Sequence, residues 1–491
     1  MNLEPFNFVE NPYVLKNTKL EPICEDTLMK YLERLGKSVE RKLKTMIPDR
    51  FGMVFDGWSM GSEHYIAIFL LWTNDKNVVQ ARLMCCGVQD EFEGDGEETG
   101  FSAEDLGDYI FDELDLLGRT DVRQRVVAAT ADGAIAAEIG NNPIEFITAD
   151  NTATNPKLAR LMGCKFKGCD AHKEALEVNE WIGPKIQKRD RDGELIPVTE
   201  RRKVLNKVDK AMVALGSLKN ASKLRRVNKL KGKRINGVRW AANLGALLRE
   251  KALREDLPRA DFDRKTKDLF LSPSEQADAD DLVHDLKKFE KANKALQGQG
   301  KTKDSPRLTV AQSRGMLDQL MKHFPGHNFT KINKNSNLVT HPVWEAAIVK
   351  IQNKMEDRLT AAEKAEVKMY LLPNAPPEEA PGHALGNEEF DIEKIISDQE
   401  KEVEARSKKS RYRATEHIFT TSVIVECLFS RAKMILEDRR KSMSPWHMEL
   451  LLFLYSNRDL WDANTVNLCM REPFWSDDEM EQDDNDDQEE A

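Results

Sequence analysis

Long apolar runs are missing from this chain of 491 residues, and their absence excludes a class of protein. The longest uninterrupted apolar stretch, residues 65–72, has eight residues, whereas a membrane-spanning helix needs about 20. No transmembrane helix and no membrane partner are therefore expected. The first residues, MNLEPFNFVENPY, have neither a basic start nor an apolar core, so we also expect no signal peptide.

Cysteine is sparse as well, with seven residues scattered over the chain. An odd number at irregular spacing does not make a disulfide framework, which favours a protein of a reducing compartment. A chain of 491 residues is too long for one ordinary core, so two or three domains are expected. Hydrophobic residues at 40% and charged residues at 32% are typical of a globular protein with polar connections.

The formal net charge of −10 hides two segments of opposite sign. Residues 477–491 hold ten acidic residues and no basic one, and without them the chain is neutral. Residues 201–240 carry fourteen Lys or Arg against one acid, Asp209. Such a block is either a solvated helical face or a surface that binds phosphates, and composition alone favours the solvated face. We expect the acidic end, residues 471–491, to be disordered.

Short apolar runs in the first part of the chain predict an α/β layer. A helix is expected from about residue 24 to residue 46, where apolar residues recur three and four apart. Ser102, with Asp105 three residues later, is typical of a helix start, and Gly118 of its end. Three strands that can pair antiparallel, followed by alternating units, suit a sheet flanked by helices. The predicted strands are residues 51–58, 64–73, 77–88, 125–131, 144–149 and 164–169.

Acidic residues follow several of these runs. Asp56 is at the carboxyl end of the first predicted strand, and Asp150 follows a later one. Asp132 is a rival because it too ends an apolar run, but Asn151 and Asn155 favour Asp150. Ligands of open α/β sheets gather at the carboxyl ends of strands, and hard cations such as Mg²⁺ bind carboxylate oxygens. If the two strands are neighbours, Asp56 and Asp150 can share a divalent ion.

The remainder of the chain is helical by pattern. A linker with four prolines, residues 373–386, separates two helical blocks, and the second block extends over residues 392–462. Few β-rich runs interrupt the first block. Its predicted helices are residues 240–252, 273–296, 310–323, 343–358 and 359–371.

Five motifs then occur in the order found in the hAT superfamily of DNA transposases. VFDGWS, residues 54–59, is similar to that family's first catalytic Asp with its Gly-Trp-Ser/Thr. FITADNTATN at 146–155 is similar to its strand with Asp-Asn, and GCDAH at 168–172 to its Cys-x-x-His. VRW at 238–240 resembles the Arg-Trp that opens the family's helical insertion. Residues 422–457 resemble its dimerisation segment, with a Glu followed by Phe-Ser and a closing Leu-rich helix that ends in Asn.

The resemblance implies an RNase H-like mixed sheet flanked by helices, interrupted by a large all-helical insertion and completed by a C-terminal helical dimerisation region. It implies that Asp56, Asp150 and Glu426 hold Mg²⁺ or Mn²⁺ and that a homodimer or higher homo-oligomer cleaves and transfers DNA strands. Carboxylates that hold two metal ions let those ions stabilise the attacking and leaving oxygens. The implied segments are an N-terminal helical segment at 1–50, a first core part at 51–184, a basic segment at 185–240, the insertion and linker at 241–390, the dimerisation region at 391–470 and the tail at 471–491.

The same resemblance assigns DNA contacts to the basic segment. Trp240 would be a stacking platform for an unpaired or flipped base; the alternative is a core residue, the commoner role of a Trp at a helix start. Phosphate binding by the basic residues would weaken steeply with salt. The residues expected to bind phosphates are Arg225, Arg226, Lys231, Lys233, Arg234 and Arg239.

Other motif residues have plainer alternatives. Cys169 and His172 are half of a zinc pattern, and Cys164 could add a third ligand. Because no fourth ligand is evident, we expect a packed structural pair and no zinc. Glu426 has the alternative of a solvated helix residue. The apolar C-terminal helices have the alternative of a core, beside a dimer interface that would be isologous by default.

The chain also departs from the hAT pattern. Cys427 follows Glu426 where the family usually has Arg, and Met443 stands where it usually has Leu. Before Asp56 there is one Cys and no His, so we expect the family's N-terminal zinc-binding DNA module to be missing.

Three functions therefore remain open from the sequence. The first is an active transposase. The alternative is a domesticated or decayed transposase that binds DNA or a partner as a dimer without catalysis, and the third is an RNase H-like nuclease that acts on other nucleic acids. The DNA role and basic clusters such as residues 231–234 favour a nuclear location.

Overall fold

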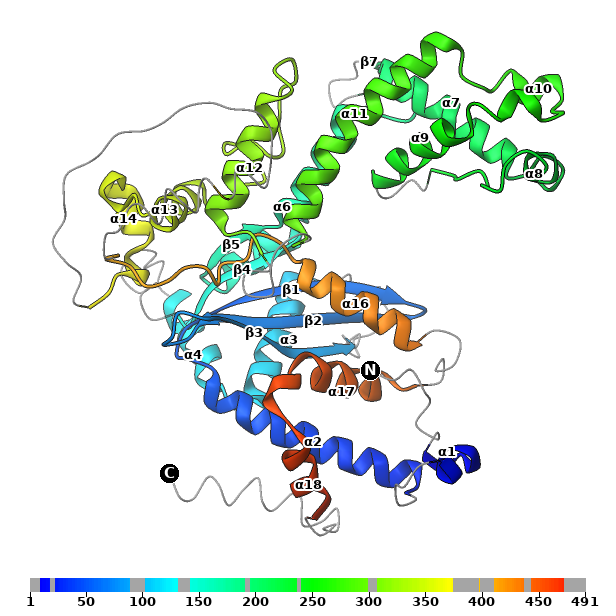
Figure 1. Ribbon diagram of the computed structural model, residues 1–491. Helices are drawn as coiled ribbons and strands as arrows, with labels where there is room; N and C mark the ends of the chain where they lie inside the picture. The colour runs from blue at the N-terminus through cyan, green and yellow to red at the C-terminus, as the bar shows by residue number, and fades with distance from the viewer. Residues whose placement is uncertain are drawn as a thin grey trace, which may run out of the picture. The chain divides into compact units, whose positions relative to one another are not determined.

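The chain folds into two compact units. Unit 1 comprises Met1–Ile147, Lys157–Lys165 and Ile424–Ala491, and unit 2 comprises Thr148–Pro156 and Phe166–Val423. A computed structural model (Figure 1) describes residues 9–17, 23–88, 102–130, 142–189, 195–235, 240–298, 307–373, 397, 410–436 and 443–471.

A five-stranded sheet has the strand order β3-β2-β1-β4-β5. The first three strands pair antiparallel. The backbone N–H of Phe51 donates to the carbonyl of Pro143 at 2.9 Å, so β1 and β4 begin side by side and run parallel. The N–H of Cys169 donates to the carbonyl of Ala149 at 2.8 Å, where β4 and β5 end together. The strands are β1 (Phe51–Met60), β2 (Glu63–Thr73), β3 (Val79–Val88), β4 (Ile144–Ala149) and β5 (Lys165–Gly168).

The central hairpin follows from the long apolar run. Residues 65–72 are all buried in β2, as expected for a strand that is covered on both faces. β1 pairs with it in the register Trp58↔Tyr65 and Met60↔Glu63. Gly61 makes the turn with a φ of +65°, a conformation that glycine adopts without steric cost.

Helices cover the sheet of unit 1. α2 buries Leu35, Val39 and Leu43, which recur at the spacing of one helix face. α17 packs on β3 and on α2, where a Cβ on Gly36 would lie 2.7 Å from Leu450. The helices assigned wholly or mostly to this unit are α1 (Pro12–Asn17), α2 (Glu25–Met46), α3 (Ala103–Leu116), α4 (Asp121–Thr130), α5 (Thr154–Leu161), α16 (Val423–Leu436), α17 (Pro445–Ser456), η6 (Arg458–Leu460) and α18 (Ala463–Arg471).

Unit 2 is predominantly helical. The rings of Trp181, Phe289 and Phe324 form its aromatic centre, with centroid distances of 4.8–5.6 Å. In Figure 1 the long helix α11 extends from beside α6 to the group of α7, α8 and α9. The elements are α6 (Asp170–Ile182), β6 (Lys188–Arg189), β7 (Leu195–Ile196), α7 (Glu200–Leu215), α8 (Leu218–Arg225), α9 (Ala241–Leu253), η3 (Leu257–Arg259), α10 (Arg264–Lys267), α11 (Pro273–Leu296), α12 (Val310–Lys322), α13 (Pro342–Gln352), η4 (Glu356–Arg358), α14 (Ala361–Glu366) and η5 (Lys368–Tyr370).

Most predicted elements are confirmed. α2, β1, β2 and β3 lie where the pattern placed them, and Ser102 caps α3 in a capping box with Asp105. Two predicted helices of unit 2 are shorter than expected, because α13 ends at Gln352 and α14 at Glu366. The linker predicted at residues 373–386 and the acidic tail predicted at 471–491 lie almost wholly outside the described residues.

The strand predicted over residues 125–131 is wrong, because α4 occupies Asp121–Thr130. Val122 and Val126 are buried and lie one helical turn apart, whereas Val127 is 57% exposed. A run of β-branched residues at the end of a helix imitated a strand. Asp132, the rival of Asp150, lies outside the described residues.

Two half-buried carboxylates, Glu113 on α3 and Glu449 on α17, lie beside β3. Glu449 accepts a hydrogen bond from the backbone N–H of Cys86 at 2.8 Å, and Tyr109 donates to the Cys85 sulfur at 3.7 Å. Burial, and then the charge of Glu449, raise the pKa of Glu113 to about 7. Burial also raises the pKa of Glu449. Two half-buried carboxylates in proximity disfavour the doubly ionised state.

Glu113 therefore makes the stability of unit 1 depend on pH. Its pKa in the folded state lies above that of an unfolded Glu, so its contribution is full below about pH 4.3 and is lost as the pH rises through about 7. We expect the free energy of unfolding, from urea titrations followed by circular dichroism, to fall between pH 5.5 and pH 8, and to fall less in Glu113→Gln. Glu104→Gln is the matched control, because Lys157 lowers the pKa of Glu104. Equal pH dependence in all three proteins would contradict this assignment.

Candidate metal centre and nucleic-acid interface

Asp56 lies within β1, where it faces the layer formed with α16. Its Oδ1 accepts a hydrogen bond from the backbone N–H of Gly57 at 2.9 Å. The expectation that Asp56 ends its strand is wrong, since β1 continues to Met60 as one arm of the hairpin with β2. Strand side chains alternate between faces, so Asp56 and Trp58 point to the same side of the sheet.

Trp58 fixes which helix covers that side. Its ring lies 5.6 Å from Tyr65 on β2 and 5.5 Å from Phe429 on α16, measured between centroids. Glu426 precedes Phe429 by three residues, so the two side chains project from the same side of α16. Unit 1 thus brings β1, with Asp56, against the helix that carries Glu426, as Figure 1 shows for β1 and α16.

Glu426 is half-buried on α16. Val425 and Leu428, its apolar neighbours, are buried, while Cys427, which departs from the hAT pattern, is exposed. Among the described residues the carboxylate of Glu426 makes no ion pair or hydrogen bond. Glu426 is thus a half-buried acid that pairs with none of the described cations, on the helix that packs against Trp58.

Asp150 follows β4 directly and sits at the start of the segment that leads into α5. Its Oδ1 accepts three hydrogen bonds, from the backbone N–H of Thr152 at 3.1 Å, from the hydroxyl of Thr152 at 2.8 Å and from Nδ2 of Asn155 at 2.6 Å. Asn151 turns the other way and donates to the carbonyl of Cys169 at 3.1 Å. The described donors to the Asp150 side chain are thus all neutral groups, which orient the carboxylate but form no ion pair with it.

The three predicted ligands do not all belong to one unit. Asp56 and Glu426 are in unit 1, and Asp150 is in unit 2. Within the described ranges, no three His, Cys, Asp or Glu side chains are grouped so that they could hold a metal ion. The structure shows two related features. β1 and β4 are neighbours in the sheet, and α16 packs on β1 through Phe429 and Trp58.

Cys169 and His172 mark the beginning of α6. Cys169 is 1% exposed and stands at the N-cap position, with its carbonyl bound to Asn151. His172 is half-buried. Burial raises the pKa of Cys164, which favours the neutral thiol at that position. The pair thus lies at the corner between β5 and α6.

A buried charge cluster at the same corner was not predicted from the sequence. Lys167 donates to Asp170 at 2.6 Å, and Ser313 donates to the other oxygen of Asp170 at 2.7 Å. Burial by itself would raise the pKa of Asp170, but the charges of Lys167 and Lys173 outweigh it and lower the pKa to about 2. The sequence feature that could have indicated this cluster is the pair of lysines, Lys167 and Lys173, on either side of GCDAH.

Part of the basic segment forms an exposed patch without acidic partners. All members of this patch are exposed, and none of their side chains makes an ion pair or hydrogen bond with the described residues. By contrast, Lys203 and Lys207 elsewhere in the segment pair with Glu200 and Glu275. We define the basic patch as Arg225, Arg226, Lys229, Lys231, Lys233 and Arg234.

The backbone of the basic patch is held in place by α7 and α9. The N–H of Ile235 donates to Asp209 at 3.0 Å, and Arg249 donates to the carbonyl of Lys231 at 2.6 Å. A Cβ on Gly232 would lie 2.6 Å from the carbonyl of Met212, so only glycine allows this close approach. The one acid of the segment, Asp209, therefore binds backbone and makes no ion pair with the described cations of the basic patch.

Trp240 takes the second of its two expected roles, that of a core residue. Its side chain is 4% exposed and packs in the core of unit 2. It lies beside Glu174, whose pKa is raised by burial to about 8 despite hydrogen bonds from Asn293 and Trp240. A stacking platform needs an open ring face, so the structure does not present Trp240 as one. Arg239 lies outside the described residues.

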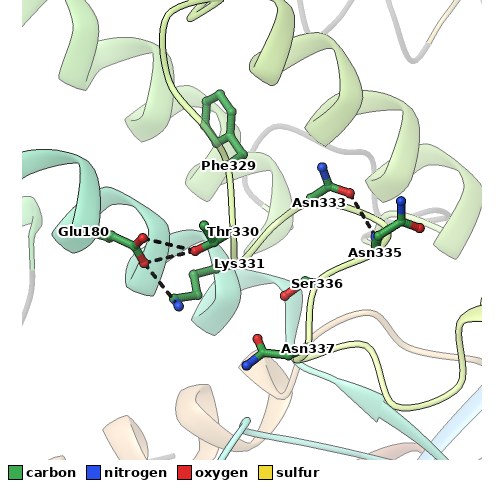
Figure 2. Close-up of a pocket in the computed structure, with 8 residues that line it drawn as sticks. All are labelled: Glu180, Phe329, Thr330, Lys331, Asn333, Asn335, Ser336 and Asn337. Atoms are coloured by element: carbon green, nitrogen blue, oxygen red, sulfur yellow. Dashed lines mark hydrogen bonds and ion pairs between the residues drawn. The ribbon is translucent and has the colours of Figure 1, made fainter. Parts of the chain in front are cut away.

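A pocket of about 410 Å³ lies in unit 2, and none of the predicted site residues lines it. Figure 2 shows Glu180 bound to Thr330 and Lys331 on one side and an Asn333–Asn335 contact on the other. Its lining includes Asn337, Ser336 and Phe329. The charges of this pocket are already paired, and none of the sequence motifs contributes to it.

The C-terminal helices supply core and expose a few large apolar side chains. α17 buries Met448, Leu452 and Leu454 in unit 1. Trp446 and Met434 remain about half exposed, at 50% and 55%. Core packing thus accounts for most of the apolar residues of these helices.

No protein-family model matches the sequence, and no curated protein is significantly similar to it. Among the described residues, no helix combines the length and the apolar character that crossing a bilayer requires.

The basic patch predicts salt-dependent DNA binding. We expect reversal of Arg225 and Arg226 to Glu to weaken binding of a labelled mixed-sequence duplex in fluorescence anisotropy. The slope of log K against log salt should also fall by about 1 for each phosphate that the protein no longer neutralises. Lys203→Glu is the control, because Lys203 already pairs with Glu200 at 2.6 Å. Unchanged affinity and slope in the double variant would make the patch a solvated face.

Proposed function

We propose that this protein is a hAT-like DNA transposase or derives from one, and that it cleaves and transfers DNA strands with a divalent metal ion. The observation that carries the proposal is the packing of Phe429 on Trp58 at 5.5 Å. That packing sets the helix of Glu426 on the sheet face of Asp56. The resemblance of the five motifs assigns the catalytic acids to these two residues and to Asp150.

The mixed sheet supports the RNase H-like core that the resemblance implies. Three antiparallel strands lead into β4, which lies beside β1 and runs parallel to it. Asp56 is on β1, and Asp150 follows the last residue of β4. Asp150 is thus at the carboxyl end of its strand, where ligand sites of such sheets gather, whereas Asp56 lies within β1. The helical part of unit 2 corresponds to the proposed insertion.

The donor set fits Mg²⁺ or Mn²⁺. All three groups are carboxylates, the oxygen ligands that hard cations prefer. Glu426 makes no ion pair with a described residue, and the described donors to Asp150 are neutral. When bound, the ions would stabilise the attacking and leaving oxygens of the displaced phosphate.

The protein's own residues would bind and orient the DNA. The basic patch would attract the phosphate backbone through charge, which gives affinity without base specificity. Asp150, whose Oδ1 is held by Thr152 and Asn155, keeps one fixed orientation. Asp56 and Glu426 would complete the acidic set. We propose that the C-terminal helices form a homodimer and that the protein acts in the nucleus.

A nicking assay tests this proposal. We expect the wild type to nick long mixed-sequence DNA when Mg²⁺ or Mn²⁺ is present, and Asp150→Asn to abolish nicking while the protein still binds DNA. Loss of a metal-bridging carboxylate removes negative charge that binding the ion requires. Asp75→Asn, an exposed Asp in the turn between β2 and β3, is the control. Nicking that persists in Asp150→Asn would contradict the assignment.

The second candidate is a dimeric DNA-binding protein without catalysis. The cations of the basic patch, which pair with none of the described acids, favour it specifically, since binding DNA through them requires no metal centre. In the same assay it predicts intact DNA with either metal, together with binding that salt releases. The two candidates therefore separate in one experiment.

A further inference from the structure

Residues 230–235, which carry three cations of the basic patch, form neither a helix nor a paired strand. They run back along α7. The N–H of Ile235 donates to Asp209 at 3.0 Å, and the N–H of Lys233 lies 3.5 Å from the sulfur of Met212, one helical turn later on α7. Two N–H groups that are two residues apart and face the same helix indicate an extended backbone. We call residues 230–235 the braced segment.

Gly232 sets how closely the braced segment approaches α7. A Cβ at this position would lie 2.6 Å from the carbonyl oxygen of Met212 and 3.2 Å from the Cβ of Leu215. The carbonyl belongs to the backbone of a helix and cannot rotate away, so a larger residue would push the segment off α7. Because side chains alternate along an extended backbone, Lys231 and Lys233 point away from the face that Gly232 turns to α7.

α9 holds the other side of the braced segment. Arg249 donates to the carbonyl of Lys231 at 2.6 Å, and Nζ of Lys233 lies 2.6 Å from the position that a Cβ on Gly245 would take. Both lysines nevertheless remain exposed. At a rise of about 3.3 Å per residue, their Cα atoms are about 6.6 Å apart, which is close to the separation of successive phosphates along a nucleic-acid strand.

The acids that contact this part of unit 2 are engaged elsewhere. Asp209 accepts the N–H of Ile235. Asp256 accepts hydrogen bonds from Asn228 at 2.8 Å and from Arg259 at 3.0 Å. Within the described part of the chain, no acid pairs with a cation of the braced segment. Its positive charges are therefore held on a fixed backbone and are available to an external anion.

We infer that the braced segment is a preformed site for the phosphate backbone of double-stranded DNA, and that Gly232 is its positioning residue. This inference rests on the proposed function and adds a requirement to it. The affinity of the basic patch depends on where its cations are held, and not on their number alone.

The side chains around the braced segment favour a duplex over a single strand. Proteins that bind single strands stack unpaired bases on aromatic rings. Trp240 is buried, at 4% exposure. The large apolar side chains that the structure shows exposed on α7, α8 and α9 are all aliphatic, namely Val213, Leu218 and Leu248. Contacts to phosphates alone suit a duplex, whose bases are already stacked and paired.

Gly232→Ala tests the inference because it changes no charge. Fluorescence anisotropy of the full chain without divalent metal measures binding of a labelled mixed-sequence duplex over a range of salt concentrations. We expect weaker binding, and a slope of log K against log salt whose magnitude falls by about 1–2, as if one or two cations had been removed. Gly326→Ala is the matched control, because a Cβ on this exposed glycine of unit 2 meets no atom within 4 Å. Thermal unfolding of each variant is measured in parallel.

Weaker binding with a lower slope in Gly232→Ala, and the control at the wild-type value, supports the inference. Wild-type affinity and slope in folded Gly232→Ala overturn it and leave DNA binding by the basic patch standing. A single strand of the same length that binds as tightly as the duplex overturns the choice of a duplex. Absence of DNA binding by the wild type overturns the inference together with the proposed function, whereas absence of nicking alone does not bear on this metal-free measurement.

Two further variants decide the question if Gly232→Ala does not fold. Lys231→Gln and Lys233→Gln should each lower the magnitude of the slope by about 0.9, the value for one phosphate contact. Lys203→Gln is their control, because Lys203 pairs with Glu200 at 2.6 Å. Slopes equal to that of the control overturn the inference.

Discussion

The contact between Trp58 and Phe429 is the constraint on which the candidate centre depends. It joins β1, near the beginning of the chain, to α16, near its end. Because Asp56 is two residues before Trp58 and Glu426 three before Phe429, the periodicities of strand and helix orient both acids toward the layer between them. Tyr65 backs the Trp58 ring from β2. An aromatic packing contact thus sets the geometry of charged groups that would otherwise repel each other.

Charge is distributed in a way that suits both binding and chemistry. In unit 2 the cations of the basic patch are exposed and unpaired with described residues, whereas Lys167 and Lys173 are buried around Asp170. The first group is available to an external polyanion. The second satisfies an internal carboxylate at the corner of β5 and α6 and contributes to rigidity there. Asp150 differs from both groups, because the described donors that hold its carboxylate, Thr152 and Asn155, are neutral.

Sequence patterns predicted α2, whose burial is periodic, and the hairpin of β1 and β2, whose second strand is a continuous apolar run. They failed for α4, because the adjacent Val126 and Val127 imitate a strand and the helical partner, Val122, lies outside that run. The carboxylates could be proposed from motifs, but their anchors could not, since the bond from Asn155 to Asp150 depends on how the chain turns after β4. The role of Trp240 could not be predicted from the sequence for a similar reason. Its position at a helix start is visible in the sequence, but its burial depends on packing within unit 2.

The central claim is that Asp56, Asp150 and Glu426 hold the same metal site. A crystal structure of the protein grown with Mn²⁺, with data collected at a wavelength where manganese scatters anomalously, measures this directly. A shared site predicts anomalous peaks within coordination distance, about 2–2.3 Å, of oxygens from all three carboxylates. Manganese peaks that contact other residues instead, or a structure in which the three carboxylates remain apart in the presence of Mn²⁺, would contradict it.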